Sequence, residues 1–378
     1  MKEVYINRIS NFFPNEPVSN EEMESYLGMI GNAPSKSKSI VLRNNGIKRR
    51  FYSFDKSGKS THTSAQMAAL AIEKLFDEKV KKEDIDFLAC GSSTPDSILP
   101  SHASLVHGEL KLKPVEILAP GGSCCTGIQS ILFAYLYIKM GMKKNAITSG
   151  SEKPSQLMLA RNFQPESDNH LRLEQNPIIA FEKDFLRWML SDGAGAALLQ
   201  DKPNENGLSL RIDWIESRSY AGDVDTCMYY GSRKNSDGKL EGWAVLEPQE
   251  WLNDSVFSMK QDTKLLAENI VPLGGKFLKE LVDKHELDIQ SIKYFCPHLS
   301  SGFFKQKIYD ELQKLGIEIT YDKWFTNLEY VGNLGCASIF IMIEELFNTG
   351  KINKGDKILC MVPESARFSY AYMLLTAV

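Results

Sequence analysis

Short apolar segments alternate along the chain with longer segments whose apolar residues recur at helical spacing. The short segments predict buried strands and the longer ones predict helices. Alternation of this kind indicates an α/β fold with a largely parallel or mixed sheet. The predicted strands are residues 3–9, 86–90, 115–118, 146–149, 292–295 and 357–362, and the predicted helices are residues 20–27, 61–76, 101–112, 127–140, 265–285 and 337–347.

The second half of the chain repeats the order of the first. Cys125 is followed by an apolar helix, a basic linker, a strand and Glu152, and Cys336 is followed in the same way by Glu364 at nearly the same spacing. We therefore predict an internal duplication into two βαβαβ halves, residues 1–204 and 205–378. Two polar stretches, 153–190 and 218–247, fit neither half. Each is expected to be either a lid or binding loop, or a solvated surface excursion.

Composition narrows the class of protein. The 378 residues are 43% hydrophobic and 24% charged, an ordinary globular balance. The formal net charge of −4 disfavours a nucleic-acid partner. No apolar run is long enough to span a membrane, and the first residues lack the apolar core of a signal peptide. Seven scattered cysteines are typical of reduced thiols, so we expect a cytoplasmic protein without a disulfide framework.

The most specific local pattern is GGSCCTG at residues 121–127, between a predicted strand and a predicted helix. The start of a helix lowers the pKa of a cysteine and so favours the nucleophilic thiolate. The alternative is that Cys124 and Cys125 are small buried hydrophobic residues, as most free cysteines are. Because neighbours on one turn point in different directions, at most one of them is expected to face a site.

Two further residues stand at positions typical of α/β sites. His298 follows the strand 292–295, at the edge where such sheets bind ligands. Asn333 lies in a glycine-flanked turn before an apolar helix. Taken singly, a structural histidine and a helix-capping asparagine are the simpler interpretations. The DGAGA stretch at 192–196 lacks the order of a dinucleotide loop, and no metal-binding motif is present, so no metal is predicted.

Taken together, the cysteine, histidine and asparagine resemble the β-ketoacyl-acyl-carrier-protein synthase III branch of the thiolase superfamily. The resemblance covers nearly the whole chain and rests on five motifs in the family's order. These are Gly46-Ile47-Lys48-Arg49-Arg50, Cys125-Thr126-Gly127, Asp192-Gly193-Ala194-Gly195-Ala196, His298, and Gly332-Asn333.

This resemblance implies a five-layered αβαβα fold and a homodimer. It implies that Cys125, rather than Cys124, forms an acyl-enzyme, and that His298 and Asn333 stabilise charge on thioester oxygens, with help from the Cys125 N–H. No cofactor is expected, because the substrates travel on the phosphopantetheine of an acyl carrier protein or on coenzyme A. An acyl carrier protein is the implied partner.

The chain departs from the common pattern at three places. Residues 363–370, PESARFSY, replace a glycine-rich loop, the insertion 153–190 is longer than expected, and the tryptophan that many members carry before the GIRxR segment is missing. The missing tryptophan favours an acyl carrier protein over coenzyme A as the acyl donor. These departures resemble the ketosynthases of dialkylresorcinol pathways. There the carbon nucleophile is a β-ketoacyl thioester, the product is a cyclohexanedione precursor, and a general base is useful. Glu152 is the candidate base and Glu364 a weaker one. The alternative for Glu152 is a surface or interface residue paired with Lys153.

A basic cluster is a candidate contact for the phosphate of phosphopantetheine or for an acidic carrier protein. It comprises Arg43 and Arg49, with Lys48 and Arg50, and its alternative is a solvated face. Three other functions compete with the dialkylresorcinol interpretation. The main one is a chain-initiating ketosynthase that uses malonyl-carrier protein in fatty acid or polyketide synthesis. The others are a hydroxymethylglutaryl-type synthase and a non-catalytic chain-length factor, which the three retained site residues disfavour.

Overall fold

The structure is a computed structural model of the full chain, and residues 1–163 and 185–378 are described. The predicted insertion 153–190 is therefore seen only at its two ends, and the remainder lies outside the described residues. Within the described ranges, no helix combines the length and the apolar character needed to cross a membrane.

One nine-stranded sheet runs through the molecule in the order β13-β14-β15-β8-β1-β7-β6-β4-β5. Outward from the centre, β7, β6 and β4 on one side correspond to β15, β14 and β13 on the other. Both sides have an antiparallel pair followed by a parallel pair. The two sides join where β1 pairs with β8, Tyr5 with Arg211 and Ile6 with Leu210. The strands are β1 Tyr5–Phe12, β4 Phe87–Gly91, β5 Glu116–Leu118, β6 Asn145–Glu152, β7 Gly193–Gln200, β8 Leu210–Ser219, β13 Ile292–Pro297, β14 Lys357–Glu364 and β15 Ser369–Ala377.

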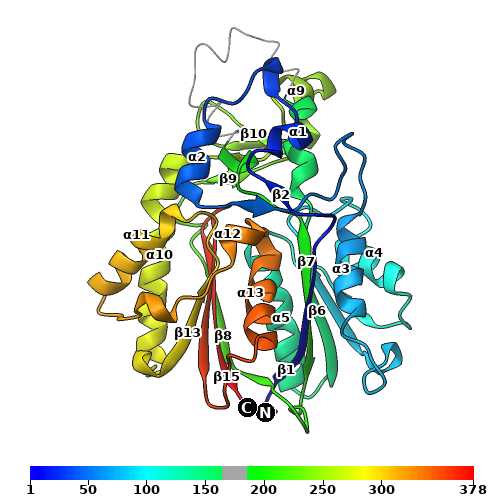
Figure 1. Ribbon diagram of the computed structural model, residues 1–378, viewed down its shortest axis with the longest axis vertical. Coiled ribbons are helices and arrows are strands. Elements are labelled where there is room, and N and C mark those ends of the chain that lie inside the picture. Colours follow the sequence, from blue (N-terminus) through cyan, green and yellow to red (C-terminus); the bar gives the residue numbers. More distant parts are fainter. Residues whose placement is uncertain (164–184) are drawn as a thin grey trace.

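Two helices, α5 (Cys125–Lys139) and α13 (Ser338–Asn348), lie side by side between the two sides of the sheet (Figure 1). Their buried residues share one core cluster with residues from both sides. The outer faces are covered by α3 (Ser64–Glu73) and α4 (His102–Leu110) on one side, and by α10 (Thr263–Lys284) and α11 (Phe303–Lys314) on the other. The predicted α/β fold with two related halves in five layers is confirmed, whereas the boundary between residues 204 and 205 stays a prediction.

The central helices are apolar because each packs against sheet on two sides. In α13 all five residues from Ile339 to Ile343 are buried. Close approach at the centre requires glycine. A Cβ atom at Gly127 of α5 would lie 2.1 Å from the carbonyl oxygen of Cys336, and one at Gly150 of β6 would lie 2.6 Å from the same atom. These glycines bring the start of α5, the end of β6 and the start of α13 together.

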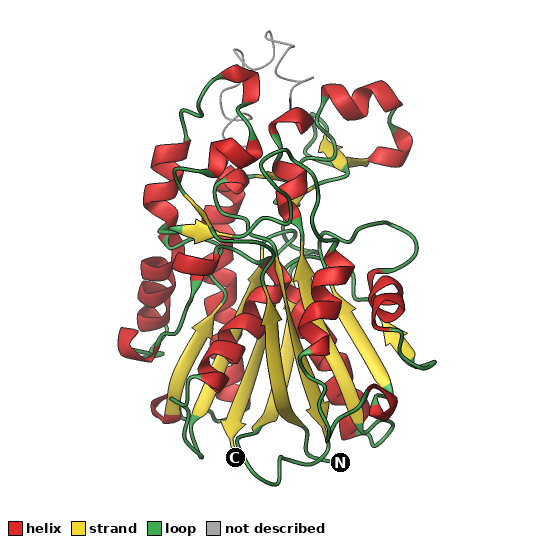
Figure 2. Ribbon diagram, turned by 45° about the vertical axis from the view of Figure 1, so that its right-hand side comes forward, coloured by secondary structure: helices red, strands yellow, loops and turns green. Residues whose placement is uncertain are grey.

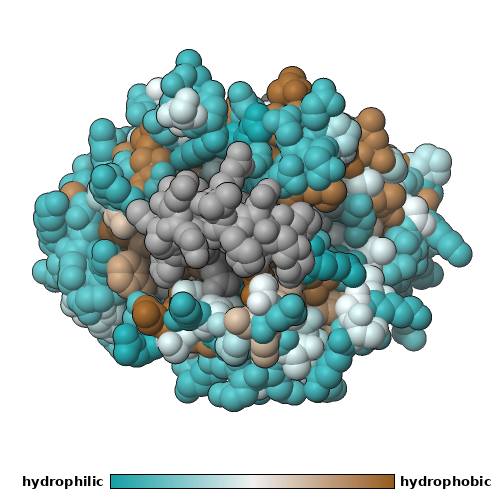
Figure 3. All heavy atoms as spheres, turned by 90° about the horizontal axis from the view of Figure 1, so that it is seen from above, coloured by the Kyte–Doolittle hydropathy of each residue, from teal (hydrophilic) through white to brown (hydrophobic). Residues whose placement is uncertain are grey.

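Shorter elements gather beyond one end of the central strands, away from the two termini (Figures 1 and 2). The helices and strands among them are β2 Val18–Ser19, α1 Met23–Leu27, α2 Lys38–Asn45, β3 Arg49–Arg50, β9 Met228–Tyr229, β10 Ser232–Lys234, β11 Leu240–Gly242, α9 Pro248–Asn253, β12 Lys260–Gln261 and α12 Leu328–Val331. Single 3₁₀ turns include η3 Pro154–Met158 and η8 Gly335–Ala337. Viewed from above, this end is mainly hydrophilic, with apolar side chains showing in separate places (Figure 3).

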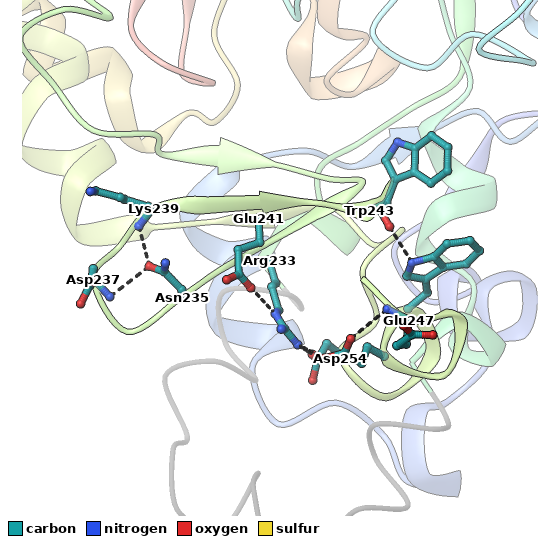
Figure 4. Close-up of polar contacts among 10 residues, drawn as sticks. Arg233, Asn235, Asp237, Lys239, Glu241, Trp243, Glu247 and Asp254 are labelled. Atoms are coloured by element: carbon teal, nitrogen blue, oxygen red, sulfur yellow. Dashed lines mark hydrogen bonds and ion pairs between the residues drawn. The ribbon is translucent and has the colours of Figure 1, made fainter. Parts of the chain in front are cut away.

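The polar stretch 218–247 runs from the end of β8 into a small folded unit, residues 228–261, at this end of the molecule. Arg233 organises the unit, because its guanidinium bonds to Glu241, Glu250 and Asp254, each at 2.8 Å (Figure 4). The Tyr230 hydroxyl donates to the carbonyl of Ser93 at 2.8 Å. This stretch is therefore an ordered part of the fold that reaches the loop after β4.

Candidate active site

The GGSCCTG segment forms the predicted turn into a helix. Gly122 has a φ of +139°, a conformation open to glycine, and Cys125 is the first residue of α5. The Cys125 side chain is buried, 1% exposed, and its thiol donates to the carbonyl of Val362 at 3.4 Å. Cys124 is partly exposed and lines a cavity. The two thiols therefore have different surroundings, and Cys124 is the one that faces the cavity.

A carboxylate from the other half of the chain lies at the start of α5. Glu364, the last residue of β14, accepts hydrogen bonds through Oε2 from the N–H groups of Ser123 and Cys125, both at 3.0 Å. The Cys125 N–H, which the resemblance assigns to a substrate oxyanion, is thus engaged by a protein carboxylate in this structure.

The predicted lowering of the cysteine pKa is wrong for this conformation. Burial, the charge of Glu364 and the neighbouring Cys124 together raise the pKa of Cys125 well above its usual range. Burial and Glu364 also raise the pKa of Cys124 to about 12. Desolvation and a nearby anion both disfavour the thiolate. Both thiols are therefore protonated in the substrate-free protein.

Glu152, at the end of β6, is buried beside the same cavity. It accepts hydrogen bonds from the hydroxyls of Ser93 and Thr94, both at 2.7 Å, and from the N–H of Cys336 at 3.1 Å. Its alternative as a surface residue paired with Lys153 is wrong, because the Lys153 ammonium donates to the hydroxyl of Ser60 instead. Glu152 thus contacts the start of the second half's central helix as Glu364 contacts the first's.

The cavity brings three of the sequence-selected residues together, Cys124, Glu152 and Asn333. The Asn333 Oδ1 accepts from the N–H of Gly335 at 3.0 Å, and no described residue bonds to its amide nitrogen, which remains a donor. At about 30 Å³ the cavity holds roughly one water, so an acyl thioester requires it to open. Its apolar wall consists of Leu186, Leu190, Met228 and Met259.

His298 follows β13 and lines a neighbouring cavity with Met361 and Pro363. Ser300 lines both cavities, so the two adjoin. Burial lowers the pKa of His298 to about 4, and the imidazole is therefore neutral near pH 7. A neutral ring still carries one N–H donor for a thioester oxygen.

The four residues of the basic cluster have different surroundings in the fold. Arg43 and Arg49 are exposed and line neither cavity, and Arg49 lies in a separate groove with Glu344 and Glu345. Lys48 pairs with Glu329. Arg50 is fully buried, and its guanidinium donates to Asn20 and to a backbone carbonyl.

Sequence reasoning missed Ser93, Thr94 and the two methionines of the cavity wall. The position of Ser93 and Thr94 directly after β4, at the end of a parallel strand, is where the sequence could have indicated them. Across the ranges that the structure describes, no group of three or more His, Cys, Asp or Glu side chains is arranged to hold a metal.

Residues 282–375 match the family described as "3-Oxoacyl-[acyl-carrier-protein (ACP)] synthase III C terminal". The chain is 25% identical over 314 residues to the β-ketoacyl-acyl-carrier-protein synthase III of Clostridium kluyveri, covering 83% of each chain. It is 26% identical over 360 residues to the same enzyme of Clostridium perfringens strain ATCC 13124, covering 95% of each.

Solved structures share the fold over 99% of both chains. AbyA1, a tetronic acid condensing enzyme, has a TM-score of 0.78 at 18% identity. Xanthomonas campestris OleA, solved with lauric acid and lauroyl-CoA, has a TM-score of 0.72 at 18% identity. The carboxy-terminal match and the similarity to these relatives over most of the chain indicate a carbon–carbon bond-forming acyltransferase that resembles β-ketoacyl-acyl-carrier-protein synthase III, with the fold of the solved condensing enzymes.

Proposed function

We propose that this ketosynthase forms an acyl-enzyme on Cys125 and condenses it with a β-ketoacyl thioester, giving a cyclohexanedione precursor of dialkylresorcinols. The observation that carries this proposal is the buried carboxylate of Glu152, which shares a cavity with Cys124 and Asn333. A base is needed when the carbon nucleophile arises by deprotonation rather than by loss of carbon dioxide.

The reaction has two stages. The Cys125 sulfur attacks the carbonyl of an acyl thioester, and the carrier thiol leaves. Glu152 then takes a proton from the methylene between the two carbonyls of the second substrate, and the resulting carbanion attacks the acyl-enzyme and releases Cys125. His298 and Asn333 donate to the thioester oxygens as charge develops. Ring closure follows within one bound molecule and gains from proximity.

An acyl carrier protein is the proposed partner, with the substrates on its phosphopantetheine or on coenzyme A and no further cofactor. We place Arg43 and Arg49 at its contact, because exposed cations complement an acidic carrier or its phosphate. Since neither lines the cavity, they would meet the carrier outside the reaction site. The four apolar wall residues would border the acyl chain once the cavity opens. A cytoplasmic enzyme is consistent with free thiols at all seven cysteines.

The second candidate is a chain-initiating synthase that uses malonyl-carrier protein, which the names of the Clostridium relatives favour. Product analysis separates the two. The purified enzyme receives an acyl thioester with either a β-ketoacyl-carrier protein or malonyl-carrier protein. A cyclic 1,3-dione without carbon dioxide release supports the first function. Efficient turnover of malonyl-carrier protein with stoichiometric carbon dioxide would reject it in favour of the second.

A further inference from the structure

The carboxylate of Glu364 reaches the start of α5 from the other half of the chain. At the starts of α3, α4 and α10, the capping side chain belongs to the residue directly before the helix. At α5, Cys124 in that position makes no side-chain cap, and the acceptor is Glu364, from β14 in the other half of the chain. Glu364 is only 8% exposed, so burial opposes its charge. A buried carboxylate beside a candidate nucleophile is typical of a functional site.

The two buried glutamates differ in their remaining capacity to take a proton. In Glu152, Oε1 accepts from the backbone N–H groups of Ser93 and Cys336 and Oε2 from two hydroxyls, so both oxygens are engaged. In Glu364, both donors reach Oε2, and no described residue donates to Oε1. Hydrogen bonds to a carboxylate weaken it as a base. Among the described residues, Glu364 therefore keeps one carboxylate oxygen open to a proton.

The charges of Glu364 and the thiols are also interdependent. The anion of Glu364 raises the pKa of Cys125, and burial raises the pKa of Glu364 itself, with Glu152 adding to the rise. Because these surroundings disfavour two anions, Glu364 and Cys125 together carry one negative charge, which either group can hold. The Cys125 thiol now donates to the carbonyl of Val362, two residues before Glu364 on β14, and the nitrogen of Cys125 already donates to Glu364. Turning the thiol about the Cα–Cβ bond would direct its proton away from Val362.

We propose that Glu364 is the proton acceptor for Cys125, and that the same transfer frees the N–H groups of Ser123 and Cys125 for the thioester oxygen. The S–H bond breaks and an O–H bond forms on Glu364. The thiolate attacks the thioester carbonyl, and the departing carrier thiolate takes the proton back from Glu364. Acyl-Cys125, a free carrier thiol and ionised Glu364 result. A neutral carboxyl accepts hydrogen bonds less strongly than a carboxylate, so the oxyanion of the intermediate displaces it.

This inference rests on the proposed acyl-enzyme, and Glu364→Gln tests it by two rates measured on the same protein. The first is alkylation of Cys125 by iodoacetamide, and the second is single-turnover transfer of the acyl group of lauroyl-CoA to Cys125. Fragmentation of the peptide in the mass spectrometer distinguishes a modification on Cys125 from one on Cys124. Removing the anion should speed alkylation several-fold, because the thiolate is no longer opposed. Removing the base should slow acyl transfer on the order of a hundredfold.

Opposite changes in the two rates support the proposal, because a structural or purely electrostatic role would move both in one direction. Glu364→Asp keeps a carboxylate and should recover part of the acyl transfer; it also serves as the test if the glutamine variant does not fold. Wild-type acyl transfer in Glu364→Gln would overturn the inference while leaving the proposed function intact, as would equal loss of both rates. A wild-type protein that never forms an acyl-enzyme would overturn both.

Discussion

Cys124 and Cys125 are adjacent residues in different surroundings, and this difference makes the nucleophile testable at the scale of single residues. Cys125→Ala should abolish transfer of a labelled acyl group to the protein, because the Cys-x-Gly match assigns the reactive thiol to Cys125. Cys124→Ala should retain substantial labelling. The measurement is mass spectrometry of the labelled peptide. An acyl adduct on Cys124 would instead make the cavity-facing thiol the nucleophile and reject the assignment of Cys125.

Glu152 belongs to the second stage of the proposed reaction. Glu152→Gln should leave acylation of Cys125 intact and slow product formation on the order of a hundredfold, since a positioned base is lost. Acyl-enzyme and product are measured together under single-turnover conditions. Glu280→Gln is the control, because Glu280 lies on α10 outside the cavity and pairs with Arg218. Equal product rates for Glu152→Gln and the wild type would remove Glu152 from the mechanism.

At the scale of elements, the close approach of α5 and η8 limits the size of the side chain at position 127. Gly127→Ala places a methyl group 2.1 Å from a backbone carbonyl oxygen, so the start of α5 must shift. Overpacking of this kind typically costs about 1–3 kcal/mol. The free energy of unfolding in urea should fall by that amount, and acylation should slow because the cysteine moves with the helix.

Gly108 of α4 provides a matched control for this substitution. Apart from its chain neighbours and the backbone of its own helix, no atom of the described residues lies within 4 Å of a Cβ built at Gly108. Gly108→Ala should therefore stabilise the protein by roughly 0.5–1 kcal/mol, because alanine favours the helix over glycine. A Gly127→Ala protein as stable as the wild type would mean that the helices separate easily, contrary to the close approach described above.

At the scale of the whole molecule, one side exposes the edge of the sheet together with a group of apolar side chains. The three-residue strand β5 ends the sheet, and Tyr137 of α5 bonds to Glu116 of β5. Four large apolar side chains of α5 and the turn after it are exposed, namely Phe133, Leu136, Met140 and Met142. An exposed group of this kind beside a free edge is typical of an interface.

We therefore expect a homodimer that joins two copies along this side. Sedimentation at micromolar concentration should give twice the chain mass. Leu136→Lys should shift the protein toward monomer, because an unpaired ammonium would be buried at the interface. Lys139→Ala, a change on the same helix that buries no charge, should leave the dimer intact. A monomeric wild-type protein would reject this expectation.

The alternation of apolar segments was enough to predict the α/β class and, within a few residues, most strands of the large sheet and most helices that pack against it, because burial on both sides of such an element shows in its own residues. The order of Cys125, His298 and Asn333 likewise predicted the similarity to synthase III. The stretch 192–196 was expected to run into a strand, and β7 is that strand. Strands β8 and β15, helices α2 and α11, and most of the short elements beyond the end of the sheet were missed. The short elements contain too few residues to show a periodicity.

The pairing of the two carboxylates with the backbone N–H groups of the cysteines was decided only by the tertiary structure. Along the sequence Cys125 leads to Glu152, and Cys336 leads to Glu364. In the fold the partners cross between the halves: the Cys125 N–H donates to Glu364 and the Cys336 N–H donates to Glu152. The cause is the packing of α5 and α13 between the two sides of the sheet, which sets the start of each helix against a strand end of the other half. Local spacing cannot encode such a contact, because it depends on how two distant segments pack.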